Sequence, residues 1–272
     1  MDTWFWVFAW FLSILAMAGN GFVIFLVCGK RQLRTKTNMF IVSLAVADFS
    51  VGMIAVPSRF FCDLVTECTE GFKAGLPVMY MRVFIVFASG TNLTSLVLER
   101  YIAVVQPLKY LTLMKRNRVT QMVVTSWGIP FLFTLTLVSI ELNLDYSVNG
   151  YLCLLFELIL CLVLIICLVS MFLVVYKQKS RDRVLVKQLQ FNQWVAKVKT
   201  QNSLALKWMA LVTGVFLLSY GIFMRCSLLV VMGHQFCNDF QYKVPLQVIN
   251  SGINPIVYAF FKRDIKQELK RS

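Results

Sequence analysis

The stretch SLVLERYIAVVQPLKY, residues 95–110, contains the feature on which the fold assignment depends. It begins within a long apolar run and ends in a basic segment marked by Pro107. Glu99, Arg100 and Tyr101 lie where the two parts meet. Charged residues at the edge of a membrane helix cost free energy, so this triplet is a candidate functional site. Glu99 can neutralise Arg100 from the adjacent position, although an arginine at a helix end also commonly extends toward the membrane interface.

The composition of the whole chain is that of a membrane protein. Its 272 residues are 58% hydrophobic and 15% charged, and the mean hydropathy is +0.71. Soluble domains are about 45–50% apolar and about 25% charged. The eight cysteines show no CxxC or other metal-binding spacing, and no nucleophile is arranged around the single histidine, His234. We therefore expect a non-enzymatic, all-α membrane protein that forms one domain over residues 1–272, without a catalytic or metal site.

Seven apolar segments are long enough to cross the roughly 30 Å hydrocarbon core as helices at about 1.5 Å per residue. The first carries no charge and lacks a cleavable small-residue site, so we expect it to be a retained span rather than a signal peptide. A short basic amphipathic helix is expected at 262–271. The predicted spans cover residues 3–29, 39–61, 72–105, 119–140, 151–176, 203–232 and 242–261.

The basic residues predict the orientation of this bundle. Of the 27 lysines and arginines, 22 lie in the segments 30–36, 100–118, 177–207 and 262–271. With seven spans these segments share one side of the membrane, and the lysine and arginine bias makes that side the cytoplasm. We expect a multi-pass protein of the plasma membrane with its N-terminus outside. The net charge of +14 then indicates contact with lipids and protein partners at the inner face, and no nucleic-acid binding.

Six groups of residues occur in a characteristic order along the spans. They are Gly19-Asn20, the run SLAVAD at 43–48, Glu99-Arg100-Tyr101, Trp127, Tyr176, and Asn254-Pro255-Ile256-Val257-Tyr258. Together they resemble the rhodopsin-like (class A) G-protein-coupled receptors along nearly the whole chain. The resemblance implies a seven-helix receptor that converts the binding of an extracellular ligand into activation of a heterotrimeric G protein.

At the cytoplasmic face the resemblance implies a coupling site. Arg100 is expected to meet a G-protein helix when the sixth span moves outward, in a helix-in-groove contact. Leu108 is expected to be an apolar contact for the G protein, or else an ordinary anchor of its loop. The implied coupling residues are Glu99, Arg100, Tyr101, Pro107, Leu108, Tyr176 and Tyr258.

A second group of polar residues lies in the middle of the spans. Asp48 is a carboxylate within an apolar segment, so it must be protonated, paired or bound to an ion. Hydroxyl and amide oxygens at similar depth would complete a site for a hard cation. The resemblance implies a sodium ion that favours the inactive state, and the alternative is a polar network that holds the helices together. The group comprises Asp48, Ser89, Asn250, Ser251 and Asn254.

The extracellular half contains two arginines that face the bundle. Arg82 precedes Arg100 by five helical turns, and Arg59 follows Asp48 by about three. They suit an anionic group on the ligand, or they pair with acidic residues of the protein such as Glu157. Arginine at position 82 argues against an amine ligand of the usual kind. The predicted ligand-binding residues are Arg59, Arg82, Val86, Glu157, Tyr220, Phe223 and Ser227.

Several landmarks of the family are missing, so the chain is a divergent member by resemblance. Gly75 stands near the position of the usual third-span cysteine, and Asn202 replaces the acid that usually tethers Arg100. Cys153 is expected to pair with Cys62 or Cys68, and Cys226 with Cys237. These losses are similar to those of the melanocortin, cannabinoid and lysophospholipid branch. The missing tether predicts measurable activity without ligand, and the altered sixth span leaves a non-signalling scaffold or heteromer partner as the alternative function.

Overall fold

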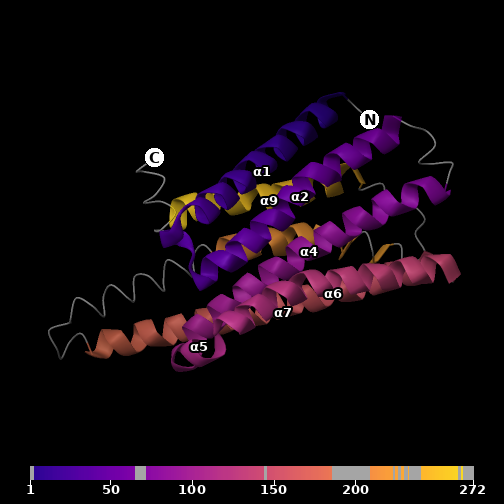
Figure 1. Cartoon of the computed structure of the whole chain (residues 1–272). Helices are drawn as coiled ribbons and strands as arrows, with labels where there is room; N and C mark the ends of the chain where they lie inside the picture. The colour runs from indigo at the N-terminus through magenta and orange to yellow at the C-terminus, as the bar shows by residue number, and fades with distance from the viewer. Residues whose placement is uncertain are drawn as a thin grey trace.

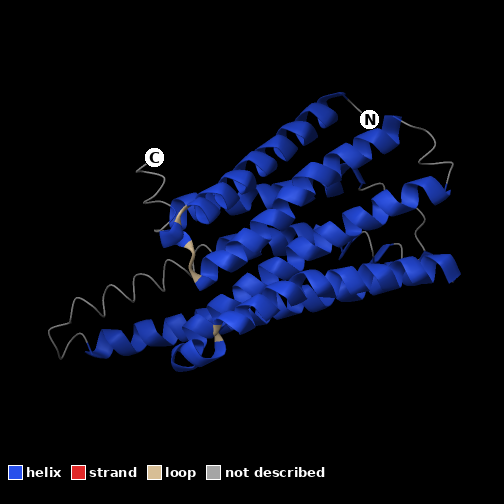
Figure 2. Ribbon diagram, in the orientation of Figure 1, coloured by secondary structure: helices blue, strands red, loops and turns tan. Residues whose placement is uncertain are grey.

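The structure, a computed structural model, is built from helices that lie side by side along one direction (Figures 1 and 2). Among the residues described, no β-strand occurs. The description covers residues 3–64, 72–143, 146–185, 209–222, 224–225, 228–229, 232, 240–262 and 265. The all-α fold class predicted from the composition is confirmed.

The helices agree with the predicted spans, and most extend beyond them. Helix α1 (Thr3–Gly29) and helix α4 (Phe72–Val105) match the predicted ranges, and α9 (Phe240–Phe261) begins two residues early. The others are longer, because a helix continues past the hydrocarbon into the interface where polar residues are tolerated. They are α2 (Lys36–Leu64), α6 (Arg116–Asn143) and α7 (Tyr146–Leu185).

Five of the described helices, namely α1, α2, α4, α6 and α7, are long and apolar enough to cross a membrane. The described part of the predicted sixth span forms the shorter apolar helix Met209–Ile222. Helix α9 falls outside the five because its polar residues Asn250, Ser251 and Asn254, all buried, lower its hydropathy. Of the predicted amphipathic helix 262–271, only residues 262 and 265 lie within the described residues.

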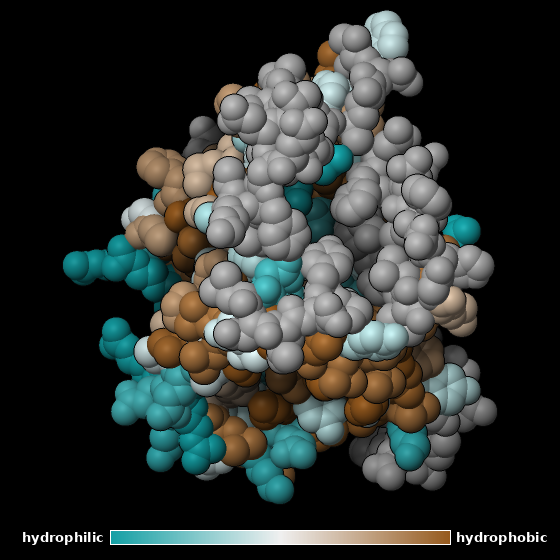
Figure 3. Space-filling model, turned by 90° about the vertical axis from the view of Figure 1, so that its right-hand side faces the viewer, coloured by the Kyte–Doolittle hydropathy of each residue, from teal (hydrophilic) through white to brown (hydrophobic). Residues whose placement is uncertain are grey.

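The bundle has two distinct ends. Helices α1, α4 and α7 begin at the end that carries Arg82, which we call the Arg82 end (Figure 1). The opposite Arg100 end holds the start of α2 and of α6, together with the short helix α5 (Pro107–Leu113). Figure 3, which looks onto the Arg82 end, shows hydrophobic side chains spread over the lower flank of the bundle. This apolar flank fits a lipid environment.

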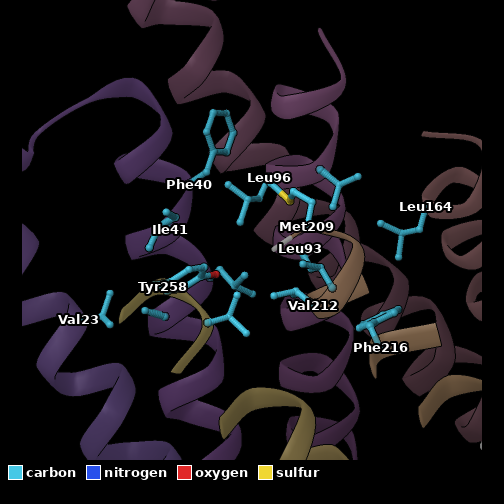
Figure 4. Close-up of a cluster of buried hydrophobic side chains, with 14 of the residues drawn as sticks. Val23, Phe40, Ile41, Leu93, Leu96, Leu164, Met209, Val212, Phe216 and Tyr258 are labelled. Carbon is cyan, nitrogen blue, oxygen red and sulfur yellow. The ribbon is translucent and has the colours of Figure 1, made fainter. Parts of the chain in front are cut away.

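The core lies between α1, α2, α4, α7, α9 and the Met209–Ile222 helix. Figure 4 shows Phe40, Ile41, Leu93, Leu96, Met209 and Val212 gathered around Tyr258, all of them buried. Helix α1 approaches α9 closely at Gly19, where an added Cβ would lie 3.1 Å from the Pro255 ring. A side chain at position 19 would press on the Pro255 ring, so glycine favours this close approach of the two helices.

A buried cluster of polar side chains joins α4, α6 and α7 at the Arg82 end. The Tyr80 hydroxyl donates to Glu141 Oε2 at 3.2 Å. Asn149 Nδ2 donates to the same Glu141 oxygen at 2.9 Å, to the Tyr80 hydroxyl at 3.1 Å and to the Leu137 carbonyl at 3.2 Å. These hydrogen bonds link α4, α6 and α7 to one another at this end of the bundle.

We expect Asn149→Leu to lower the apparent melting temperature of the purified protein. The change removes three hydrogen bonds and leaves the Glu141 carboxylate with fewer donors, which costs about 1–3 kcal/mol in a buried site. Thermal unfolding in detergent measures this effect. The control is Thr136→Val on α6, because the exposed Thr136 hydroxyl bonds only to the Leu132 carbonyl of its own helix. Equal melting temperatures for Asn149→Leu and Thr136→Val would show that the cluster adds no stability.

Candidate functional site

Arg100 lies in a cage of polar side chains at the Arg100 end. Its Nε is 2.9 Å from Glu99 Oε2, and its Nη2 donates to the Thr37 hydroxyl. Thr37 donates in turn to Glu99 Oε1 at 2.9 Å, and the Tyr110 hydroxyl donates to the same oxygen at 2.7 Å. The Glu99 carboxylate is fully buried and the Arg100 side chain is 21% exposed. The predicted neutralisation of Arg100 by Glu99 is confirmed.

Three elements converge to build this cage, and two of its members were not predicted. Glu99 and Arg100 come from α4, Thr37 from the first turn of α2, and Tyr110 from α5. Burial and the charge of Glu99 raise the pKa of Tyr110 to about 12, so its hydroxyl remains a donor at neutral pH. Neither Thr37 nor Tyr110 stands at a distinctive spacing in the sequence, and only their contacts reveal their role in the cage.

The remaining predicted coupling residues have different environments. Pro107 occupies the first turn of α5, where its missing N–H is not needed, and Leu108 beside it is 92% exposed. Tyr176 on α7 is 64% exposed and stacks on Phe172, whereas Tyr258 is buried in the core. Tyr101 packs at the edge of that core. The exposed Leu108 fits a partner contact better than the anchoring of its loop.

The polar group in the middle of the bundle is assembled around Asp48. This carboxylate is completely buried. Ser89 donates to Asp48 Oδ1 at 2.6 Å, Asn254 Nδ2 donates to Oδ2 at 2.6 Å, and the Ser251 side chain also bonds to the carboxylate. Helices α2, α4 and α9 therefore meet at one carboxylate, as the sequence predicted.

Several acceptor oxygens in the same region have no hydrogen-bond donor within the described part of the chain. They are the side-chain carbonyl oxygens of Asn20, Asn250 and Asn254. Asn20 was quoted only as a family landmark, but its amide Nδ2 bonds to the Ser251 carbonyl at 3.0 Å and thus joins α1 to this group. Buried acceptors are normally paired with a donor or a cation, so the site can accommodate an ion or water.

A second polar network holds α2, α4 and α6 together. Asn92 Oδ1 accepts hydrogen bonds from Ser43 at 2.6 Å and from Ser126 at 2.9 Å, and Trp127 Nε1 donates to the Ser43 hydroxyl at 3.0 Å. The Asn92 side chain at the centre of this network is buried. The conspicuous Trp127 therefore anchors α6 to α2.

A cavity of about 140 Å³ opens near the Arg82 end between α4, α7, α9 and the Met209–Ile222 helix. Four residues that the sequence suggested for ligand binding line it, namely Arg82, Val86, Glu157 and Tyr220, and Cys153 and Gln247 are further lining residues. Tyr220 stacks on Phe216 with ring centroids 4.0 Å apart. Phe223 and Ser227 lie outside the described residues.

Arg59 on α2 is not among the residues that line this cavity, so its role in ligand binding stays a prediction. One expectation for this region needs correction. Cys153 has a free thiol, so it does not pair with Cys62 or Cys68. The reason is its position on α7, one turn before Glu157, where it faces the cavity instead of the connecting segments. Cys68, Cys226, Cys237 and the side chain of Cys62 lie outside the described residues.

Comparison with known proteins agrees with this architecture. The buried Asp48 group, the Arg100 cage and the helical bundle define a membrane receptor of the seven-helix class. The family model for the 7 transmembrane receptor (rhodopsin family) matches residues 19–258, and the chain belongs to this family. Receptors of this family are not enzymes, which confirms the expectation drawn from the sequence.

Curated relatives include receptors for peptides and amines. Neuromedin-U receptor 1 of Mus musculus is 31% identical over 46% of this chain and 29% of its own length. Histamine H2 receptor of Canis lupus familiaris is 37% identical over 48% of this chain and 36% of its own length. Trace amine-associated receptor 1 of Mus musculus is 26% identical over 95% of this chain and 85% of its own length. The first two matches thus span about a third of each relative.

Proposed function

We propose that this chain is a G-protein-coupled receptor of the plasma membrane that converts binding of an extracellular ligand into nucleotide exchange on a heterotrimeric G protein. The observation that carries the proposal is the Arg100 cage beside the exposed Leu108. A neutralised, partly buried arginine next to an exposed apolar side chain fits a site with two arrangements, one closed and one open to a partner. The basic segments at the same end support an orientation with the N-terminus outside.

The test is a ligand screen on the full chain in nanodiscs with purified G protein, read out as nucleotide exchange. An active compound, or exchange above that of empty nanodiscs, supports the proposal. The alternative function is a non-signalling scaffold or heteromer partner. A scaffold would reach the cell surface and yet promote no exchange with any compound or any G-protein subtype.

We propose that the ligand carries an anionic group that contacts Arg82. A guanidinium beside a small, mostly apolar cavity provides charge-assisted, bidentate donors for a carboxylate or a phosphate. Glu157 lines the same cavity, so the alternative role of Arg82 is to pair with that carboxylate within the protein. The two roles differ in what the removal of each residue does.

Arg82→Ala is expected to weaken an agonist identified in the screen by about ten- to hundredfold, because a charge-assisted contact contributes about 1.5–3 kcal/mol. Concentration–response curves for nucleotide exchange measure the shift. Arg59→Ala is the matched control, since this arginine does not line the cavity, and it should leave potency unchanged. If Arg82→Ala instead lowers surface expression and Glu157→Ala restores it, the arginine has a structural role.

We further propose that a sodium ion binds at Asp48 in the resting state. The unpaired amide oxygens of Asn20, Asn250 and Asn254 next to a buried carboxylate are the donor set that a hard cation prefers. The bound ion would supply charge compensation to Asp48. The ion can act on the equilibrium only through a difference in its affinity between the resting and active states.

Replacing sodium with N-methyl-D-glucamine is expected to raise basal nucleotide exchange and to lower the apparent melting temperature. Both responses should disappear in Asp48→Asn, which lacks the anionic ligand. Ser50→Ala serves as control, because the exposed Ser50 hydroxyl on the same helix bonds only to the Val46 carbonyl. An unchanged salt response in Asp48→Asn would leave the group as a polar network that joins helices.

A further inference from the structure

An open groove of about 820 Å³ lies at the Arg100 end and is formed by α1, α2 and α6. This volume is within the range of small-molecule sites. The groove is separate from the Arg82 cavity and from the Asp48 group, and none of the residues discussed for coupling lines it.

The groove has a basic mouth and an apolar wall. Arg34, Lys36 and Arg116, all exposed, surround the mouth, and no acidic side chain occurs among the lining residues. Arg34 donates one hydrogen bond to the Cys28 carbonyl at 2.6 Å and retains further donors. Helices α2 and α6 also begin at this mouth, so the partial positive charges of their N-termini add to those of the side chains. The mouth is therefore complementary to an anion.

The length of the groove matches one leaflet of a bilayer. It extends along α2 from Lys36 to Val46 and along α6 from Arg116 to Trp127, which at 1.5 Å per residue corresponds to about 15 Å. Half of the hydrocarbon core is also about 15 Å. Val46 and Val123 line the inner part, and Trp127 is held in place by its bond to Ser43. An acyl chain would thus lie along this wall from the interface to the centre of the membrane.

We propose that the groove binds an anionic phospholipid of the cytoplasmic leaflet, with its headgroup on Arg34, Lys36 and Arg116 and an acyl chain along Val46, Val123 and Trp127. A free phosphate would not use the apolar wall, and a neutral sterol would not use three cations. The cytoplasmic leaflet is the one rich in anionic lipids, and its assignment to this end rests on the orientation under the proposed function. The bound lipid would stabilise the connection between α1 and α2. Its contact Lys36 directly precedes Thr37 of the cage.

The experiment uses the full chain in nanodiscs that contain equal amounts of phosphatidylcholine and phosphatidylserine. Native mass spectrometry measures the ratio of the two lipids retained by the protein. Phosphatidylserine should be enriched, and neutralising one cation should lower this enrichment about fivefold. The combined variant Arg34→Gln, Lys36→Gln, Arg116→Gln should lower it by at least about tenfold.

Two controls separate the groove from a general charge effect. Lys109→Gln, Lys115→Gln, Arg118→Gln removes three exposed cations at the same end that do not line the groove, and it should preserve the enrichment. Arg34→Lys, Arg116→Lys retains both charges and should also preserve it, which guards against loss of folding in the glutamine variant. Equal losses in the two glutamine variants would overturn the proposal.

Two further arms identify the ligand. Val46→Trp, which fills the apolar wall and keeps the cations, should reduce retention of phosphatidylserine. Excess soluble glycerophosphoserine, the headgroup without acyl chains, should not displace the lipid. Displacement by this headgroup, by inorganic phosphate or by cholesterol would overturn the assignment to a phospholipid. The readout is independent of coupling, so failure here leaves the receptor function intact, and a silent receptor would still bind the lipid.

Discussion

Arg100→Ala is expected to abolish agonist-stimulated nucleotide exchange while the protein still reaches the cell surface. The guanidinium is the central cation of the cage, and in the active state we expect it to contact a G-protein helix. Central arginine contacts at interfaces typically contribute at least 2 kcal/mol, which corresponds to a loss of roughly thirtyfold or more. Exchange on purified G protein, normalised to surface expression, measures the loss.

A matched arginine distinguishes this contact from a loss of positive charge. Arg118 on α6 lies at the same end of the bundle, is exposed and takes no part in the cage. Arg118→Ala should therefore change exchange by only a few-fold, as is typical of a peripheral charge. If Arg118→Ala and Arg100→Ala reduce exchange equally, general electrostatics rather than a specific contact accounts for the effect.

Glu99→Gln is expected to raise ligand-independent exchange by about ten- to hundredfold. The buried carboxylate pairs with Arg100 and accepts hydrogen bonds from Thr37 and Tyr110, so it stabilises the closed arrangement. Glutamine retains the size but loses the charge, and hydrogen bonds to a charged group contribute about 1.5–3 kcal/mol. A shift of that size in the equilibrium between closed and open states gives the expected increase. Basal exchange in nanodiscs without added ligand measures it.

A smaller increase is expected for Tyr110→Phe, which removes one of the donors to Glu99. Because the pKa of Tyr110 is about 12, the hydroxyl is lost as a donor only as the pH rises toward that value. The effect of Tyr110→Phe should therefore be the same at pH 6 and at pH 8. Thr112→Val provides the control, since the exposed Thr112 hydroxyl bonds to Lys109 within α5 and should leave basal exchange unchanged. Basal exchange that is equally low in Glu99→Gln and in the parent protein would mean that the cage does not hold the resting state.

The fold was largely predictable because a membrane helix is specified by local composition. Thr3–Gly29 and Phe72–Val105 were predicted to the residue, since apolar runs of this length must satisfy their backbone hydrogen bonds internally in lipid. The ends of α2, α6 and α7 were less accurate, because beyond the hydrocarbon the helix is no longer required and its continuation depends on neighbours. A helix occupies the position of the predicted seventh span, although its buried polar residues lower its hydropathy.

The candidate sites were predictable where a costly residue occurs within an apolar segment. Asp48 and Arg82 stand out for this reason, and helical spacing correctly oriented Arg82 toward the cavity. Spacing did not decide whether Arg59 reaches the cavity, because a helical period gives a residue's face but not which neighbour that face meets. The expected pairing of Cys153 was wrong, since a cysteine near a helix end can face either the interior or the connecting segments.

The sequence by itself determined the class of protein, the order of the spans and the identity of the charged residues that lipid would not tolerate without partners. Only the tertiary structure decided which side chains become those partners. Thr37 and Tyr110 meet Glu99 from 62 and 11 residues away, and Asn254 reaches Asp48 from a distance of 206 residues. These contacts depend on how helices pack, and packing is a property of whole surfaces in three dimensions rather than of any local pattern.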